Sequence, residues 1–146
     1  MPEAPAPEAA DAPYARPLPR PTPESRPFWE ACRRHELLLQ HCRACGRWWH
    51  PPSAFCPNCW SDDFAWKAVA GRGRVFSWVV YGRVYHPAFR EAVPYDVAVI
   101  ELDEGPRLVS NVVEVDPRRL TCGLRVEVVF DDVTPDVTLP RFRPAP

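Results

Sequence analysis

The hydrophobic residues of this chain follow two periods, and the change falls near Val69. Before it, a short apolar stripe at helical spacing follows Ser25, a suitable helix N-cap. This stripe predicts a short helix to about Arg34, and its members are Phe28, Trp29 and Cys32. From Val69 onward apolar and polar residues alternate, which is typical of half-buried strands. The pattern therefore predicts a mainly β chain with a short N-terminal helix.

The alternating region divides into five predicted strands separated by turn signals. They cover residues 71–81, 94–102, 107–115, 124–130 and 137–142. The third strand is followed by a break that allows a short helical turn at most. Five strands with a break after the third fit a small OB-fold barrel. An SH3-like barrel is the alternative.

Two Cys-x-x-Cys pairs lie between the helix and the alternating region. They are Cys42 with Cys45 and Cys56 with Cys59. Two facing pairs make a tetrahedral sulfur site for Zn²⁺, and a site closed by four thiolates is structural because no position stays open for water. We therefore predict a zinc ribbon. Iron in the same cage, as in rubredoxin, and disulfides are the alternatives.

The residues after the cysteine pairs bear on the choice of metal. In rubredoxins a glycine usually follows each pair; here Gly46 follows the first pair, whereas Trp60 follows the second. This departure favours zinc over iron. His41 and His50 lie close to the pairs, but four cysteines already satisfy the metal.

These patterns divide the chain into three parts. Residues 1–23 are dominated by Pro, Ala and Glu and are predicted to be a disordered leader or linker. Residues 24–67 hold the helix and the rubredoxin-like zinc ribbon. Residues 68–146 hold the predicted OB-fold.

Composition and charge narrow the classes of function. The net charge of −1 argues against a general nucleic-acid binder, which would carry a marked positive excess. No apolar run is long enough to span a bilayer, and the N-terminus has no signal-peptide pattern. We therefore expect a cytoplasmic protein, in which cysteines stay reduced and available to a metal.

Residues 82–93 form a long predicted loop that carries Tyr85 and His86 as candidate functional residues. His86 has no carboxylate or cysteine neighbour in sequence that would make it a general base. A reactive thiol needs both a positive environment and an adjacent base, and nothing near Cys122 in sequence supplies both. The chain also has no Ser-His-Asp order and no phosphate-binding glycine loop. We therefore predict that it is not an enzyme by itself.

An ordered set of motifs runs through residues 25–143. It consists of Pro27-Phe-Trp-Glu, Cys42-x-x-Cys45-Gly, Cys56-Pro-x-Cys59, Gly71-x-Gly-x-Val-x-Ser77, Pro94-Tyr and Leu139-Pro-Arg-Phe142. Together these motifs resemble a family long catalogued as a domain of unknown function, in which a rubredoxin-like zinc ribbon precedes an OB-fold and which is associated with acyl-CoA.

The resemblance implies a noncatalytic accessory subunit that pairs with a thiolase-like or aldolase protein, or with an enoyl-CoA hydratase. It also implies that the complex acts on acyl-CoA thioesters. Within that class, the Pro-rich leader favours the retro-aldol branch of steroid side-chain degradation. In that setting Arg72, Arg74 and Arg83 are candidates to meet the phosphates of CoA. The alternative is that they are solvated strand-edge charges. Phe28 and Trp29 are candidate contacts with the partner.

Two further hypotheses belong to other classes of protein. Zinc ribbons and OB-folds also bind single-stranded nucleic acid, and Phe76, Trp78 and Tyr81 are aromatic residues available for stacking. Iron in the cysteine cage would make the chain an electron carrier.

Overall fold

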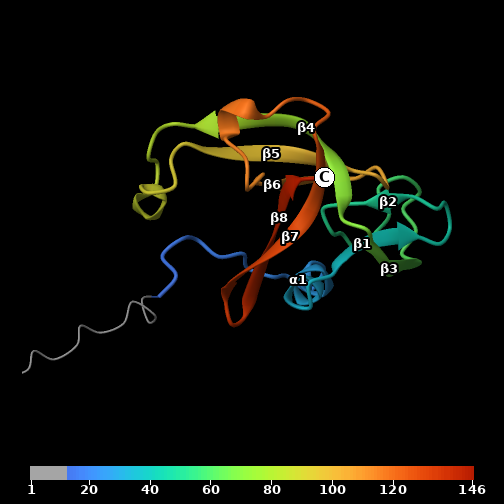
Figure 1. Cartoon of the computed structure of the whole chain (residues 1–146). Helices are drawn as coiled ribbons and strands as arrows, with labels where there is room; N and C mark the ends of the chain where they lie inside the picture. Colours follow the sequence, from blue (N-terminus) through green and yellow to red (C-terminus); the bar gives the residue numbers. More distant parts are fainter. Residues whose placement is uncertain (1–12) are drawn as a thin grey trace, which may run out of the picture.

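The computed structural model describes residues 13–146 and confirms a mainly β chain with a short α-helix (Figure 1). Residues 1–12 of the predicted leader lie outside the described residues. The elements are α1 (Arg26–Arg33), β1 (Leu37–Cys42), β2 (Trp48–Trp49), β3 (Phe64–Val69), β4 (Arg72–Tyr81), η1 (Pro87–Phe89), β5 (Tyr95–Leu102), β6 (Arg107–Ser110), η2 (Pro117–Arg119), β7 (Arg125–Thr134) and β8 (Val137–Pro144). Helix α1 has eight residues and is too short to cross a bilayer; the structure describes no membrane-spanning helix within residues 13–146.

Helix α1 begins at the predicted position, with Ser25 at the N-cap and Pro27 in the first turn. The Ser25 side chain does not cap the helix; its hydroxyl is hydrogen-bonded with Thr22 instead. The predicted apolar stripe is buried in part, because Phe28 and Cys32 face the core and Trp29 lies at its margin. This stripe fastens the helix to the two sheets.

The first sheet has the strand order β2-β1-β3, with both pairs antiparallel. Leu37 and Leu39 of β1 are buried. Strand β3 ends at Val69, and the chain turns at Gly71 into the second sheet. Gly71 has a φ of +70°, a left-handed conformation that favours glycine.

The second sheet has the strand order β6-β5-β4-β7-β8 and closes almost into a barrel. Closure occurs through a parallel bridge between Val112, just beyond β6, and Phe142 of β8. The backbone N–H of Val113 donates to Phe142 at 2.7 Å, and the N–H of Phe142 donates to Asn111 at 3.0 Å. The third strand of the barrel thus meets the fifth, which is the arrangement of an OB-fold rather than an SH3-like barrel.

Strands β6 and β7 differ in extent from the sequence expectation, and β7 continues to Thr134 rather than ending at residue 130. Strand β6 stops at Ser110 rather than at residue 115, because the chain then leaves β5 to bridge β8. The buried carboxylate of Asp96 stabilises this change of direction, because it accepts a hydrogen bond from the N–H of Val112 at 2.8 Å. Strand β4 has a register shift between Val75 and Ser77, which bends it.

Helix, ribbon and barrel share one hydrophobic core. The cluster joins Phe28 of α1 and Leu39 of β1 to Val75, Ile100 and Phe142 of the barrel, and all five residues are buried. A smaller cluster around Trp49 and two of the cysteines lies within the ribbon. The ribbon is therefore fixed against the barrel by apolar burial as well as by the chain that joins them.

Residues 13–23 of the predicted leader run beside the barrel (Figure 1). The Arg16 guanidinium donates to the carbonyl of Ala88 at 3.3 Å and lies 4.6 Å from the centroid of the Phe89 ring. These contacts connect the leader to the loop between β4 and β5.

Candidate metal centre and partner-facing surfaces

The four cysteines predicted as metal ligands gather at one point of the ribbon. Their sulfur atoms all lie within 4.8 Å of one another. The Sγ atoms of Cys42 and Cys59 are 3.6 Å apart, as are those of Cys45 and Cys56. In a tetrahedron with Zn–S bonds of about 2.3 Å the sulfur atoms are about 3.8 Å apart. The cage therefore fits a tetrahedral metal ion such as zinc.

Two turns of matching geometry build this cage. In the first, Gly46 N–H donates to the carbonyl of Cys42 at 3.0 Å; in the second, Trp60 N–H donates to Cys56 at 2.9 Å. Gly46 and Trp60 both have positive φ, +79° and +63°. Trp60 thus occupies the position that suits glycine, and its side chain is 76% exposed. An indole held outward on a strained backbone is a candidate contact surface.

The protonation of the cage differs between the cysteines. A hydrogen bond with the Asn58 side chain, followed by one with the Arg47 backbone, lowers the pKa of Cys45 to about 6. The Ser61 backbone also favours the thiolate of Cys59, but desolvation and the neighbouring cysteines together raise the pKa of Cys59 to about 12. Metal binding requires all four thiolates, so it has to release the protons that the cage still holds.

The two nearby histidines lie outside the group of four sulfur ligands. Burial lowers the pKa of His50 to about 4, and its neutral ring packs 5.1 Å from the ring of Phe28. His41 packs against Trp48 at 4.5 Å. Both rings therefore serve packing.

A second feature is an apolar outer face on the barrel, which we call the valine face. It consists of Val79 of β4, Val97 and Val99 of β5, and Val109 of β6. Directly opposed residues of antiparallel strands present side chains to the same side, and Val79 opposes Val97 while Val99 opposes Val109. Val79 is 55% exposed and Val109 is 67% exposed. Exposed apolar surface of this kind is typical of protein contacts.

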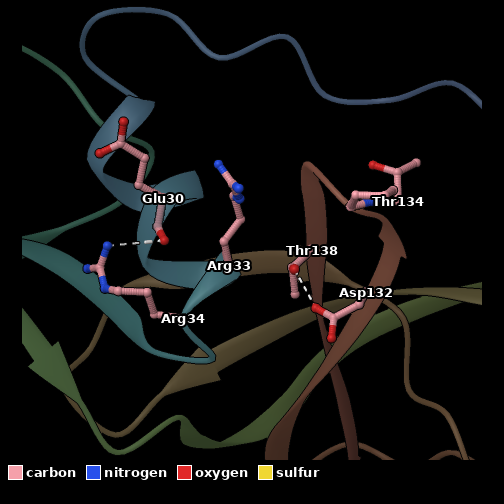
Figure 2. Close-up of a pocket in the computed structure, with 7 residues that line it drawn as sticks. Glu30, Arg33, Arg34, Asp132, Thr134 and Thr138 are labelled. Carbon is pink, nitrogen blue, oxygen red and sulfur yellow. Dashed lines mark hydrogen bonds between the residues drawn. The ribbon is translucent and has the colours of Figure 1, made fainter.

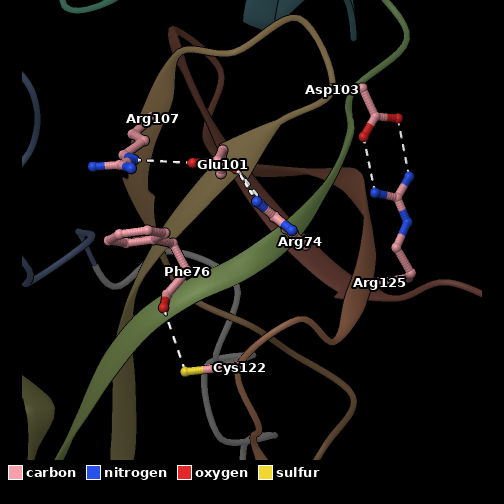
Figure 3. A network of polar contacts seen from close by, with 7 residues as sticks. All are labelled: Arg74, Phe76, Glu101, Asp103, Arg107, Cys122 and Arg125. Carbon is pink, nitrogen blue, oxygen red and sulfur yellow. Dashed lines mark hydrogen bonds and ion pairs between the residues drawn. The ribbon is translucent and has the colours of Figure 1, made fainter.

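A polar network borders the valine face (Figure 3). The Glu101 carboxylate accepts from Arg74 at 2.6 Å and from Arg107 at 3.2 Å. These two guanidinium groups hold the pKa of Glu101 below its usual range. Arg107 also lies 3.7 Å from the centroid of the Phe76 ring. The face of Phe76 is thus covered by a cation, which occupies a surface that a nucleic-acid base would need for stacking.

The candidate CoA-binding arginines are in different situations. Arg74 is ion-paired with Glu101, as described above, and Arg72 lies near Asp103, which is itself bonded to Arg125 at 2.8 Å. Arg83 lies in the loop after β4, is exposed, and forms no ion pair within residues 13–146. Of the three, Arg74 is therefore the one held in an ion pair within residues 13–146.

An apolar groove of about 510 Å³ runs between α1, the ribbon and the barrel. Trp29, Pro51, Leu108 and Val109 are among its lining residues. Phe28 also contributes to the groove but is only 3% exposed, so its main contacts are in the core. Trp29 is the member of the predicted aromatic pair that borders open space. Val109 belongs to both the groove and the valine face, so the two apolar surfaces are continuous.

The loop between β4 and β5 carries the other candidate residues. The His86 ring accepts from Ala88 N–H through Nδ1 at 3.1 Å and so caps the short helix η1. Tyr85 is exposed and packs edge-on against Tyr81 at 5.9 Å. Neither residue faces a described carboxylate or thiol within hydrogen-bonding distance. His86 is thus placed to shape the loop.

A polar hollow of about 570 Å³ lies between α1 and the turn that joins β7 to β8 (Figure 2). Its residues form local pairs: Arg34 donates to the carbonyl of Glu30 at 3.2 Å, and Thr138 donates to Asp132 at 2.5 Å. Oδ1 of the Asp132 carboxylate also lies within hydrogen-bonding distance of Nε2 of His35, at 2.9 Å. The hollow combines charges of both signs and shows no nucleophile positioned by a base.

These features define a class of protein: a four-cysteine ribbon of rubredoxin type joined to an OB-fold barrel. Family models agree with this division. Residues 29–65 match the model described as "ChsH2, rubredoxin-like zinc ribbon domain", and residues 66–131 match "ChsH2, C-terminal OB-fold domain". The chain belongs to this ChsH2 family, which is also known as DUF35, and the sequence-based resemblance is confirmed.

Individual relatives carry names from acyl-CoA metabolism or assembly. A Thermomonospora curvata protein named "Probable enoyl-CoA hydratase alpha subunit" is 43% identical over 81% of this chain, and the match spans 37% of that protein. A Methanocaldococcus jannaschii "DUF35 domain-containing scaffold protein" is 32% identical, with 70% of this chain and 73% of that protein covered. The chain thus spans little more than a third of the first relative and most of the second.

A solved structure, "Ltp2-ChsH2(DUF35) aldolase", contains a similar chain. The two share 39% sequence identity and a TM-score of 0.81, and the match covers 88% of this chain and all of that one. A DUF35 protein from Sulfolobus solfataricus, 14% identical with a TM-score of 0.58, matches in fold.

Sequence reasoning found the cysteine cage but missed the valine face. The run Val79-Val80-Tyr81 could have revealed this face, because consecutive apolar residues place apolar side chains on both faces of the predicted strand. In a small barrel only one side of a strand faces the core, so a run without alternation leaves apolar side chains outside. Sequence reasoning also missed Asp96, whose buried carboxylate fixes the point at which the barrel closes.

Proposed function

We propose that this chain is a noncatalytic accessory subunit of a thiolase-like or aldolase complex that acts on acyl-CoA thioesters. The observation that carries the proposal is the match, along almost its whole described length, to a chain of the Ltp2-ChsH2(DUF35) aldolase structure. Relatives named as a hydratase alpha subunit and as the "Benzoylsuccinyl-CoA thiolase subunit BbsA" of Geobacter metallireducens support the same class of complex.

The surfaces of the chain support an accessory role. The valine face and the adjoining groove offer apolar contact area, whereas no nucleophile, base and anion-binding group converge within residues 13–146. In this role the partner supplies the reacting groups, and this chain supplies a rigid surface. The finer proposal is retro-aldol cleavage in steroid side-chain degradation, with Arg83 and Tyr85 contacting the CoA thioester and the partner.

The metal has a structural part in this proposal. Cys42, Cys45, Cys56 and Cys59 would hold zinc, which when bound cross-links the two turns of the ribbon. Fixing the ribbon also fixes Trp60 and the groove beside Pro51. Because a four-cysteine metal site requires reduced cysteines, we further propose a reducing compartment, the cytoplasm.

Co-expression with a candidate thiolase-like or aldolase protein from the same organism tests the proposal. We expect the two to co-purify in a defined ratio, and cleavage of a CoA thioester to require both chains. Each chain assayed alone is the control, together with Cys122→Ser, which changes an exposed thiol away from the cage. A failure to form any complex, or full activity of the partner alone, would contradict the proposal.

The nucleic-acid alternative is tested on the same preparation. A gel shift with single-stranded DNA at low salt is expected to show no retardation, because the net charge is −1 and Arg107 covers the Phe76 ring. A salt-dependent shift at micromolar protein would instead favour a nucleic-acid-binding module.

A further inference from the structure

The second half of β4 has an open edge. Strand β5 pairs with β4 on one side as far as Tyr81, but on the other side β7 pairs with it only from Arg72 to Arg74. Val75 is hydrogen-bonded to Gly123 and Leu124. Beyond it, no backbone hydrogen bond within residues 13–146 connects Ser77–Tyr81 to a segment on that side. Five residues of strand are thus available to a new neighbour.

The direction of the free backbone groups follows from two contacts. Val75 bonds to Gly123 and Leu124, and the Phe76 carbonyl accepts from the Cys122 thiol at 3.5 Å, so both point away from β5. Figure 3 shows the Phe76 carbonyl directed at Cys122. Along a strand, a carbonyl and the next residue's N–H point to opposite sides, and the direction alternates residue by residue. The N–H and C=O groups of Trp78 and Val80 therefore point to the open edge.

The side chains along this edge are apolar and unprotected. Val79, Val80 and Tyr81 are all exposed, and the edge segment contains no lysine, proline or inward charge of the kind that discourages strand pairing. Arg83 lies two residues beyond Tyr81 and is exposed, and it forms no ion pair within residues 13–146. The edge thus offers backbone bonds, apolar contacts and a cation at its end.

We propose that an extended segment of the partner enzyme subunit adds to β4 as a new strand along Ser77–Tyr81. Strand addition to an open edge is a recurrent mode of recognition, and five residues give about 17 Å of paired length. The segment carries alternating apolar residues and a carboxylate that meets Arg83. This inference rests on the proposed function, and it specifies the contact by which the accessory subunit holds its partner.

Charge complementarity favours this occupant over a second copy of the chain. Two copies paired antiparallel about Val79 would bring each Arg83 near the other copy's Arg74. The carboxylate at that end is Glu101, which is already bonded to Arg74 and Arg107. A partner segment with its own carboxylate avoids this juxtaposition of cations.

Proline at position 80 tests the proposal with little change to the rest of the sheet. Val80→Pro removes one N–H that points to the open edge and leaves the β4–β5 ladder bonds in place. We expect it to weaken the complex with the thiolase-like partner by about tenfold or more, because a buried acceptor of the added strand loses its donor. The matched control Val80→Ala keeps the N–H and should change the dissociation constant much less. Arg83→Glu should weaken binding through the terminal charge.

Hydrogen exchange on the wild-type complex gives a second readout that needs no variant. The amides of Trp78 and Val80 should become protected when the partner binds. Unchanged affinity of Val80→Pro together with unprotected amides would overturn strand addition while leaving the accessory role intact. If Val109→Arg on the valine face weakens binding and Val80→Pro does not, the contact is face to face instead. A wild-type chain that binds no partner overturns both proposals, and an edge-dependent homodimer assigns the edge to a second copy.

Discussion

Replacing Gly71 by alanine probes the junction between ribbon and barrel. Gly71 has a φ of +70°, and a Cβ added there would lie 2.2 Å from Cγ1 and 3.0 Å from Cβ of Val128 on β7. The backbone N–H of Val128 donates to the Gly71 carbonyl at 2.7 Å, so the two residues cannot separate without losing this bond. The substitution therefore meets a conformational and a steric obstacle at once.

The expected loss of stability is the sum of these effects. A non-glycine residue in the left-handed region costs about 1–2 kcal/mol. Overpacking against Val128 adds about 1–3 kcal/mol. The lower entropy of the unfolded alanine chain offsets about 0.5 kcal/mol. We therefore expect Gly71→Ala to lower the free energy of unfolding by about 1.5–4.5 kcal/mol.

Gly123→Ala is the matched control, because Gly123 has a φ of +84° but no atom within 4 Å of an added Cβ. It should lose about 1 kcal/mol from conformation alone. Urea unfolding of metal-saturated protein, followed by tryptophan fluorescence, measures both variants. A double-mutant cycle with Val128→Ala removes Cγ1, so the cost of Gly71→Ala in that background should fall by about 1–2 kcal/mol. Equal losses at both glycines, or no coupling to Val128, would refute the steric argument.

Three further predictions concern the cage and the barrel. Cys56→Ser should lose the bound metal and unfold the ribbon, whereas Cys122→Ser should keep one equivalent of metal. Metal analysis measures the metal content and circular dichroism measures the folding of both variants. Metal retained by Cys56→Ser would refute the four-thiolate cage. Trp60→Gly should be more stable than Trp60→Ala by about 1 kcal/mol because φ is +63°, and equal melting temperatures would show that this backbone is unstrained. Desolvation raises the pKa of Asp96, so the native state holds its proton more tightly and stability falls as pH rises from its ordinary value through the raised one. The urea midpoint of Asp96→Asn should therefore rise relative to that of the wild type as the pH is raised from 4 to 8. A difference between the two midpoints that does not change with pH would contradict this.

The family of the chain could be predicted from the sequence because local spacing fixes it. Cys42-x-x-Cys45 and Cys56-x-x-Cys59 each close within a single turn, so their chemistry does not depend on distant contacts. The position of helix α1 also followed from local signals, namely a serine at the N-cap position, Ser25, and the apolar stripe from Phe28 to Cys32, although the Ser25 side chain makes no capping bond. Strand positions followed from the alternation of apolar and polar residues, with β6 overextended by five residues beyond Ser110.

The tertiary structure decided which strand surfaces are buried and which edges are paired. Strand β7 begins at Arg125, opposite Arg74, so it pairs with β4 only from Arg72 to Arg74 and leaves the edge at Val80 unpaired by β7. Alternation cannot reveal such an edge, because pairing depends on the relative positions of strands about 50 residues apart in the chain. The sequence therefore determined the metal site and the order of the elements, since both arise from neighbouring residues. The surfaces that we propose as partner contacts arise from long-range packing, so only the folded chain reveals them.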